Sequence, residues 1–200
     1  MPRNVEIKAR ADCLEALLAR ALTLADGPAQ TLVQDDTFFA VPHGRLKLRL
    51  VDGAAAELIH YERPDAPGAR ASDYVRVAVP DAAALREALA RGLGVVGRVR
   101  KRRWLLLAGQ TRIHLDRVEG LGDFVELEVV LRAGQSDADG ARVAEDLMRA
   151  LGLADAPRLA GAYLDLRPAE RVSCAQSAQS AQSAKTPPAP EPPAPRRSPP

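Results

Sequence analysis

Two glutamates, Glu126 and Glu128, lie in a segment whose other positions are mainly aliphatic. An alternation with a period of two places both carboxylates on one face of a β-strand and Val125, Leu127 and Val129 on the other. Carboxylates this close repel each other unless a cation or basic groups offset their charge. Carboxylate oxygens favour hard cations such as Mg²⁺ or Mn²⁺. The pair is therefore a candidate metal site, with a solvated strand face as the alternative.

Other segments repeat the alternation with basic side chains. Rows of Lys and Arg suit phosphate oxygens, and Arg can engage two of them at once. Acids for a metal beside bases for phosphates indicate a metal–polyphosphate site, although each strand taken alone also fits a solvated face with weak ion pairs. The acidic candidates are Glu6, Asp116, Glu126 and Glu128, and the basic candidates are Lys8, Arg45, Lys47, Arg49, Arg63, Arg76, Lys101, Arg103, Arg112 and Arg158.

The run from 98 to 103 carries basic residues on both faces of its predicted strand. Arg98, Arg100 and Arg102 must point away from the side of Lys101 and Arg103. Only one of these two faces can therefore belong to the site.

Composition limits the class of protein. The chain has 200 residues, and its 28 basic and 26 acidic side chains nearly cancel, so no overall basic field for nucleic acid is expected. The two cysteines, Cys13 and Cys174, do not form a disulfide framework. Neither an apolar leader nor a run long enough for a membrane span is evident. We expect a cytoplasmic protein that binds a small molecule.

The elements expected from periodicity form an antiparallel sheet with helices packed outside, in a domain over residues 1–167. Residues 168–200 are rich in Ala, Gln, Ser and Pro and are expected to be a disordered tail. Helices are expected to begin at Asp12, at Pro80–Asp81 and at Ser136 or Asp137. The pattern fits both a closed barrel with a polar lumen and an open sheet. Strands are expected at about 3–10, 35–41, 44–51, 56–63, 73–79, 98–107, 111–117, 123–131 and 161–166.

Six motifs in order resemble the CYTH domain of the triphosphate tunnel metalloenzymes, especially the branch similar to class IV adenylate cyclases. The resemblance covers about residues 3–166 and implies a closed eight-stranded antiparallel β-barrel, whose polar tunnel binds a triphosphate with Mg²⁺ or Mn²⁺. The motifs are Val5-Glu6-Ile7-Lys8, Arg45-Leu46-Lys47-Leu48-Arg49, Tyr61-Glu62-Arg63-Pro64, Lys101-Arg102-Arg103, Ile113-His114-Leu115-Asp116 and Phe124-Val125-Glu126-Leu127-Glu128.

The resemblance also assigns roles to individual residues. One position departs from the family, because Asn4 stands where the opening signature has its first acid, which brings an oxygen ligand without charge. The implied metal ligands are Glu6, Glu126 and Glu128, with Asp116 as a further acidic position. The implied phosphate-binding residues are Lys8, Lys47, Arg49 and Lys101 or Arg103, with Arg158 as the counterpart of a basic residue near the carboxyl end.

A metal-dependent phosphohydrolase acting on inorganic or organic triphosphates is the function expected first. Tripolyphosphate, thiamine triphosphate and ATP are the candidate substrates, and Lys8 is the candidate general base or water-orienting group. A class IV-type adenylate cyclase, which would convert ATP to cyclic AMP and pyrophosphate, is the second hypothesis. A non-catalytic module that binds polyphosphate or nucleotide is the third, and Asn4 favours it.

Overall fold

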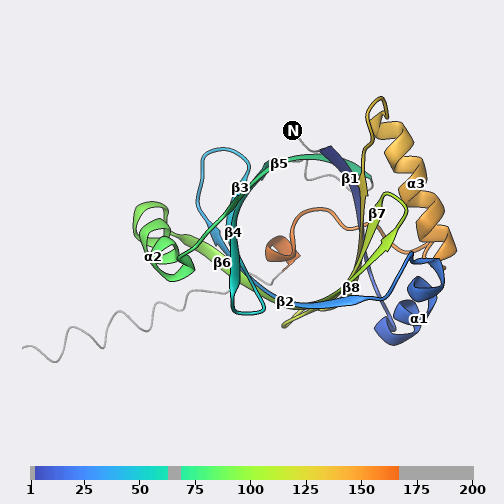
Figure 1. Ribbon diagram of the computed structural model, residues 1–200, viewed down its shortest axis with the longest axis horizontal. Helices are drawn as coiled ribbons and strands as arrows, with labels where there is room; N and C mark the ends of the chain where they lie inside the picture. Colours follow the sequence, from blue (N-terminus) through green and yellow to red (C-terminus); the bar gives the residue numbers. More distant parts are fainter. Residues whose placement is uncertain (1–2, 63–68, 167–200) are drawn as a thin grey trace, which may run out of the picture. The chain divides into compact units, whose positions relative to one another are not determined.

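The computed structural model describes residues 3–62 and 69–166. Its strands close into an antiparallel barrel in the order β1-β5-β4-β3-β2-β6-β7-β8 (Figure 1). The closed eight-stranded barrel implied by the resemblance is thus confirmed, while the predicted tail at 168–200 lies outside the described residues. The strands are β1 (Arg3–Arg10), β2 (Gln30–Phe39), β3 (Arg45–Val51), β4 (Ala55–Glu62), β5 (Arg70–Ala78), β6 (Val95–Ala108), β7 (Thr111–Val118) and β8 (Gly122–Val130).

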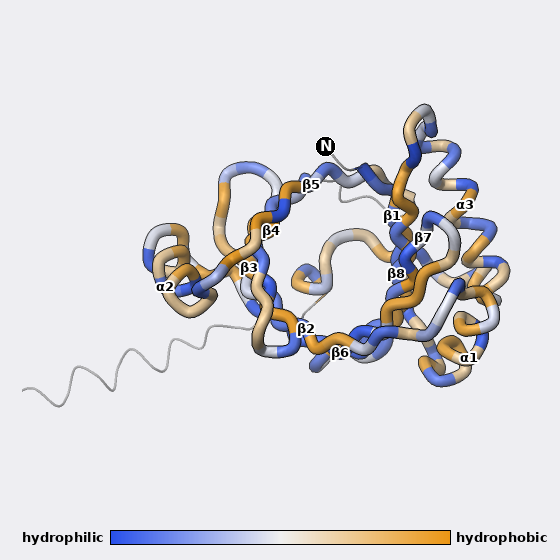
Figure 2. Tube along the Cα trace, viewed as in Figure 1, coloured by the Kyte–Doolittle hydropathy of each residue, from blue (hydrophilic) through white to orange (hydrophobic). Residues whose placement is uncertain are grey.

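The largest hydrophobic core lies outside the barrel wall, where aliphatic residues of β1, β6, β7 and β8 pack against the helices on that side. Figure 2 shows hydrophobic and hydrophilic residues along both the strands and the helices. Val125, Leu127 and Val129 of β8 are fully buried against helices α1 (Leu14–Leu24) and α3 (Asp137–Ala150). Ile7 of β1 and Met148 of α3 belong to the same core. Removing this apolar surface from water stabilises the wall that carries the acidic strand β8.

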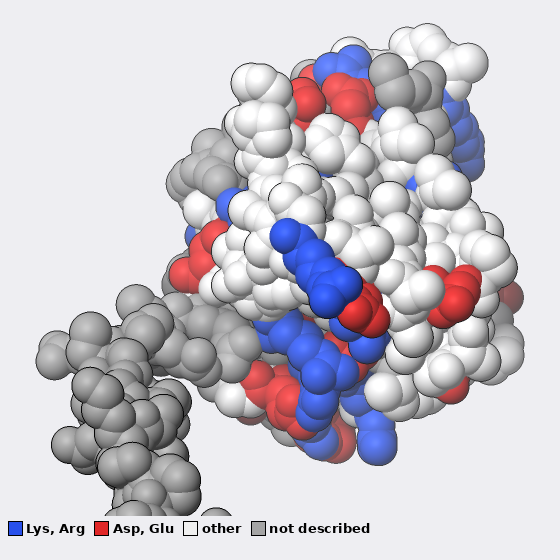
Figure 3. All heavy atoms as spheres, turned by 90° about the vertical axis from the view of Figure 1, so that its left-hand side faces the viewer, with Lys and Arg blue, Asp and Glu red and all other residues white. Residues whose placement is uncertain are grey.

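Helix α2 (Ala82–Leu93) packs on the other side of the barrel, where it has no fully buried residue (Figure 1). It begins after Asp81, as predicted, since the Asp81 carboxylate accepts a hydrogen bond from the Ala84 amide at 3.0 Å. On this face Lys and Arg side chains are interspersed with Asp and Glu (Figure 3). No helix in the described ranges is long and apolar enough to span a membrane.

The other two helix starts differ slightly from each other in how they are capped. Ser136 and Asp139 form a capping box at the start of α3, in agreement with the prediction. The N-cap of α1 is Cys13, whose side chain makes no capping hydrogen bond, so the predicted start at Asp12 is wrong by one residue.

The strand predicted at 161–166 is wrong. A 3₁₀ helix, η1 (Tyr163–Leu166), occupies this stretch and lies within the ring of strands (Figure 1). Gly161 has a φ of +73°, a conformation that glycine adopts without strain and that turns the chain out of an extended path. The Asp165 carboxylate then accepts a hydrogen bond from the Ala162 amide at 2.6 Å and stabilises the turn.

We predict that Gly140→Ala in α3 lowers the free energy of unfolding by about 1–3 kcal/mol, because the added methyl group overpacks the contact between α3 and β1. A Cβ at Gly140 would lie 2.6 Å from Leu131 and 2.8 Å from Val5. Gly92→Ala in α2 is the matched control, since a Cβ there meets nothing within 4 Å. Urea denaturation of both variants checks the prediction, and equal stabilities would contradict it.

Candidate functional site

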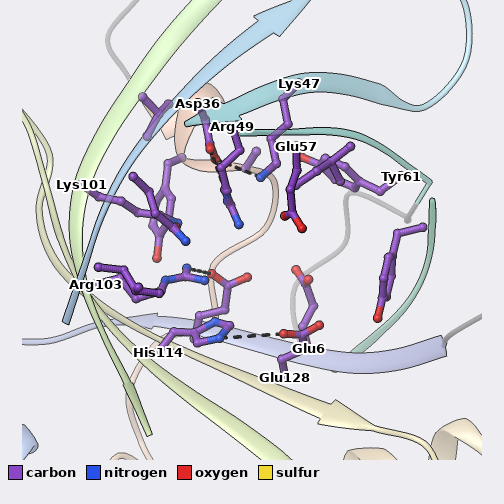
Figure 4. Close-up of a pocket in the computed structure, with 18 of the residues that line it drawn as sticks. Glu6, Asp36, Lys47, Arg49, Glu57, Tyr61, Lys101, Arg103, His114 and Glu128 are labelled. Carbon is purple, nitrogen blue, oxygen red and sulfur yellow. Dashed lines mark hydrogen bonds and ion pairs between the residues drawn. The ribbon is translucent and has the colours of Figure 1, made fainter. Parts of the chain in front are cut away.

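The lumen holds a cavity of about 440 Å³, lined by side chains from all eight strands and from the segment that ends in η1 (Figure 4). This volume falls within the usual range for small-molecule sites. Arg63 lies outside the described residues. Of the other residues predicted for the site, those that line the cavity are Glu6, Lys8, Lys47, Arg49, Arg76, Lys101, Arg103, Arg112, Glu126 and Glu128.

Asp36 of β2 is a central residue that the sequence did not single out. Its carboxylate accepts two hydrogen bonds from Arg49, each of 2.7 Å, and one from Lys47 at 3.0 Å (Figure 4). Burial opposes ionisation, but the two basic groups hold the pKa of Asp36 well below its usual value. The neighbouring Asp35 points outward to Arg98, so the choice between two adjacent acids could not be made from alternation alone.

Asp116 was predicted as a metal ligand, and the structure corrects this. Its carboxylate is fully buried and does not line the cavity. It accepts hydrogen bonds from Arg103 at 2.6 Å, Lys101 at 3.2 Å and the Tyr163 hydroxyl at 2.8 Å. Burial raises the pKa of Asp116, but Arg103 and Lys101 outweigh that effect and keep it below its usual range. Asp116 therefore fixes basic side chains in place.

Tyr163 of η1 contacts two lysines at the end of the lumen where η1 lies. The Lys8 ammonium lies 4.3 Å from the centroid of its ring, and the Lys101 ammonium lies 4.9 Å from it. Lys8 also donates a hydrogen bond to the Gly161 carbonyl at 3.2 Å. Burial, helped by Arg103, lowers the pKa of Lys101 to about 7. The sequence offered no signal for Tyr163, because the segment was expected to be a strand.

Carboxylates gather where β1 runs beside β8, across the lumen from Asp36 and Arg49 (Figure 4). Glu6 is directly opposite Glu128 in the strand register, and Figure 4 shows Glu6, Glu57 and Glu128 pointing into the same part of the lumen. Glu57 was not predicted, and its carboxylate lies 3.8 Å from Arg76. Glu128 accepts one hydrogen bond from the Asn4 amide and pairs with Arg112 at 3.1 Å.

Not every predicted metal ligand is equally suited to a cation. Glu126 pairs with Arg103 at 3.1 Å. Burial raises the pKa of Glu126, but Lys8 and Arg103 outweigh that effect and hold it well below the usual value. Within the described part of the chain, no three His, Cys, Asp or Glu side chains are already grouped around a common metal position. The Asn4 Oδ1 atom is buried and has no hydrogen-bond partner there. Together with the Glu6 and Glu128 carboxylates it makes a set of hard oxygen donors that fits Mg²⁺ or Mn²⁺.

Arg158 was predicted to bind substrate, and the structure shows that it lies elsewhere. Its backbone forms a bridge with Ala9, a residue of the outer core. Its guanidinium group donates to the carbonyl groups of Leu153 and Ala156 and pairs with Glu145 of α3 at 2.7 Å. Arg158 thus ties the chain that follows α3 to the helix. A single basic residue gives no local sign of which role it takes.

The model of the CYTH domain family matches residues 2–163. The chain is similar to the PH1012 protein of Pyrococcus horikoshii OT3 (24% identity, TM-score 0.72) and to a conserved hypothetical protein of Pyrococcus furiosus (26% identity, TM-score 0.72), each covering 82% of this chain and 99% of the other. It is also similar in fold to the Hippeastrum protein HpAC1, named for adenylyl cyclase and found to have a dominant triphosphatase activity (16% identity, TM-score 0.58, covering 80% and 91%). A comparison with curated proteins gave no match.

We predict that Arg158→Met leaves the affinity for tripolyphosphate unchanged and lowers the free energy of unfolding by about 1–3 kcal/mol, because it removes charged hydrogen bonds outside the lumen. Arg103→Met should instead weaken tripolyphosphate binding by about tenfold or more, since it removes a positive charge from the cavity wall. Calorimetric titration and urea denaturation measure the two effects. A loss of affinity in the Arg158 variant would restore that residue to the site.

The pH dependence of binding should report on Lys101. Its pKa of about 7 means that the free protein loses this proton near neutrality, whereas bound phosphate favours the charged ammonium. Affinity for tripolyphosphate should therefore fall as the pH rises from about 6 to about 9, and Lys101→Arg, which keeps its charge, should show a smaller fall. Calorimetric titrations in EDTA at several pH values measure the affinity of the wild type and of Lys101→Arg. The protonation of tripolyphosphate affects both proteins alike, so it cancels in the difference between the two pH curves. Parallel curves would contradict the assignment.

Proposed function

This chain belongs to the CYTH domain family, and we propose that it is a metal-dependent phosphohydrolase that acts on triphosphates bound in the lumen. One observation carries the proposal: a single cavity holds preorganised basic groups on β3 and β6 and carboxylates on β1 and β8. The first set suits phosphate oxygens and the second suits a divalent cation. Neither set would gather in a closed lumen merely to stabilise the barrel, because burying charge is costly.

Phosphate binding is assigned to Arg49, Arg103, Lys47 and Lys101. Asp36 and Asp116 beneath them fix these side chains before any ligand arrives. Donors that are already oriented lose little free energy to reorganisation when charge develops on a leaving phosphate. Arg76 and Arg112 are more exposed, at 52% and 34% of their side-chain surface, and would contact the outer part of a ligand.

Glu6 and Glu128, with the amide oxygen of Asn4, are the groups that would hold Mg²⁺ or Mn²⁺. When bound, the cation would supply positive charge for the phosphate oxygens and lower the pKa of a water ligand. Glu126 lies among Lys8, Arg103 and Lys101, so we assign it to position these basic groups. Lys8 acts as a hydrogen-bond donor toward the Gly161 carbonyl, and we assign it to orient a phosphate or the attacking water rather than to remove a proton.

The experiment is to measure phosphate release from tripolyphosphate, thiamine triphosphate and ATP with Mg²⁺ or Mn²⁺. Glu128→Gln should lower the rate on the preferred substrate by about 100-fold, because it removes a carboxylate charge from the cation site without changing the size of the side chain. Glu87→Gln on α2, where the side chain is 70% exposed, is the matched control and should keep the wild-type rate.

Product analysis decides between the activities. Orthophosphate and a diphosphate from the wild type support hydrolysis, whereas cyclic AMP with pyrophosphate from ATP would replace it by cyclase chemistry. Tight binding without any product, or equal rates for the wild type and the Glu128 variant, would contradict the proposed mechanism.

A further inference from the structure

Apolar side chains line the lumen at the end that lies away from η1. We call Leu32 of β2, Val51 of β3, Ala55 of β4 and Leu105 of β6 the apolar strip; all of them line the cavity, on four neighbouring strands. Leu32, Val51 and Leu105 belong to none of the three hydrophobic clusters of the described residues and are partly exposed. The strip is therefore apolar surface inside the lumen that is not packed into a hydrophobic core.

The strip borders the basic groups of β3 and β6. Leu32 is directly opposite Arg103 in the register of β2 and β6, and Val51 follows Arg49 by two residues on the same face of β3. Two residues along a strand span roughly 7 Å, so the strip lies next to these basic groups along the lumen. Phosphates held by Arg49 and Arg103 would thus place the next group of the ligand beside the strip, whose own side chains offer a further phosphate no charged partner. Arg76 and Arg112 lie on strands outside the strip, β5 and β7.

Gln34 supplies a hydrogen-bonding group within the strip. It lies between Leu32 and Val51, follows Leu32 on the same face of β2 and pairs with Val51 across to β3. Gln34 is 5% exposed, and its Oε1 atom is buried without a hydrogen-bond partner in the described residues. A buried acceptor of this kind is costly unless a ligand or water satisfies it. A neutral amide is also of little use to a phosphate, compared with the charged groups deeper in the lumen.

We propose that the apolar strip and Gln34 form a subsite for the organic group of an organic triphosphate, namely a ring with an apolar face and an N–H or O–H donor. The tunnel would then select organic triphosphates over inorganic tripolyphosphate. The inference rests on the proposed binding of triphosphates and deepens it, because it names the class of substrate. The ring packs on Leu32, Val51 and Leu105 while its donor reaches the Gln34 oxygen.

The test is calorimetric titration in EDTA, which prevents metal-dependent turnover, with ATP, thiamine triphosphate and tripolyphosphate as probes. At least one organic probe should bind the wild type about tenfold more tightly than tripolyphosphate. Leu32→Ala and Gln34→Leu should each weaken that organic probe by about fivefold to tenfold and leave tripolyphosphate unchanged, because they alter only the subsite. Val33→Ala is the matched control; Val33 is 53% exposed on the outer face of the same strand, and its loss should change neither affinity.

The outcomes separate this inference from the proposed function. If tripolyphosphate binds as tightly as both organic probes, or if the variants weaken all probes equally, the subsite is refuted while triphosphate binding stands. If no probe binds the folded wild type in EDTA and none is hydrolysed with Mg²⁺ or Mn²⁺, the proposed function fails and the subsite with it. Leu105→Ala is the second strip variant should Leu32→Ala fail to fold, as judged by its thermal unfolding. The preferred organic probe also identifies the kind of ring that the subsite takes.

Discussion

Charge buried inside a closed barrel is the constraint on which the rest of this structure depends. A carboxylate withdrawn from water costs several kcal/mol unless basic groups and hydrogen bonds compensate it. Asp36 and Asp116 meet this requirement by binding bases on neighbouring strands, namely Arg49 and Lys47 for the first, Arg103 and Lys101 for the second. The same pairs fix where the guanidinium and ammonium groups point. The arrangement that compensates the buried carboxylates therefore also orients the basic groups of the proposed phosphate site.

A polar lumen forces the hydrophobic core to the outside of the wall, and the helices cover that wall unequally. Strands β1, β7 and β8 are backed by α1 and α3 over a core that includes several fully buried side chains. Strand β5 carries Val75 and Val77 on its outer face at 49% and 55% exposure. The carboxylates Glu6 and Glu128 therefore stand on the best-packed strands. A site whose acids directly oppose each other needs such a rigid support, because repulsion would otherwise spread the strands.

Alternation predicted much of the fold, and it failed where one strand carries polar groups on both faces. The faces of β1, β3 and β8 could be assigned from sequence because aliphatic residues mark the outside. The pair Asp35 and Asp36 could not be assigned, since only partners on other strands separate the outward acid from the inward one. The path of η1 depends on a glycine turn and a single carboxylate contact. Long-range pairing of this kind leaves no periodic trace along the chain.

The two walls of the lumen also depend on each other energetically. In the proposed function, an anion bound by β3 and β6 would favour a cation near Glu6 and Glu128, and the cation would favour the anion by the same factor, because coupling between two binding sites is reciprocal. Asn4 lies at this junction: its amide donates to Glu128 while its oxygen faces no partner among the described residues. An amide in place of a carboxylate reduces the negative charge that must be offset there. In the proposed function, the cation would therefore bind more weakly without phosphate, and its binding would depend more strongly on a triphosphate already in the tunnel.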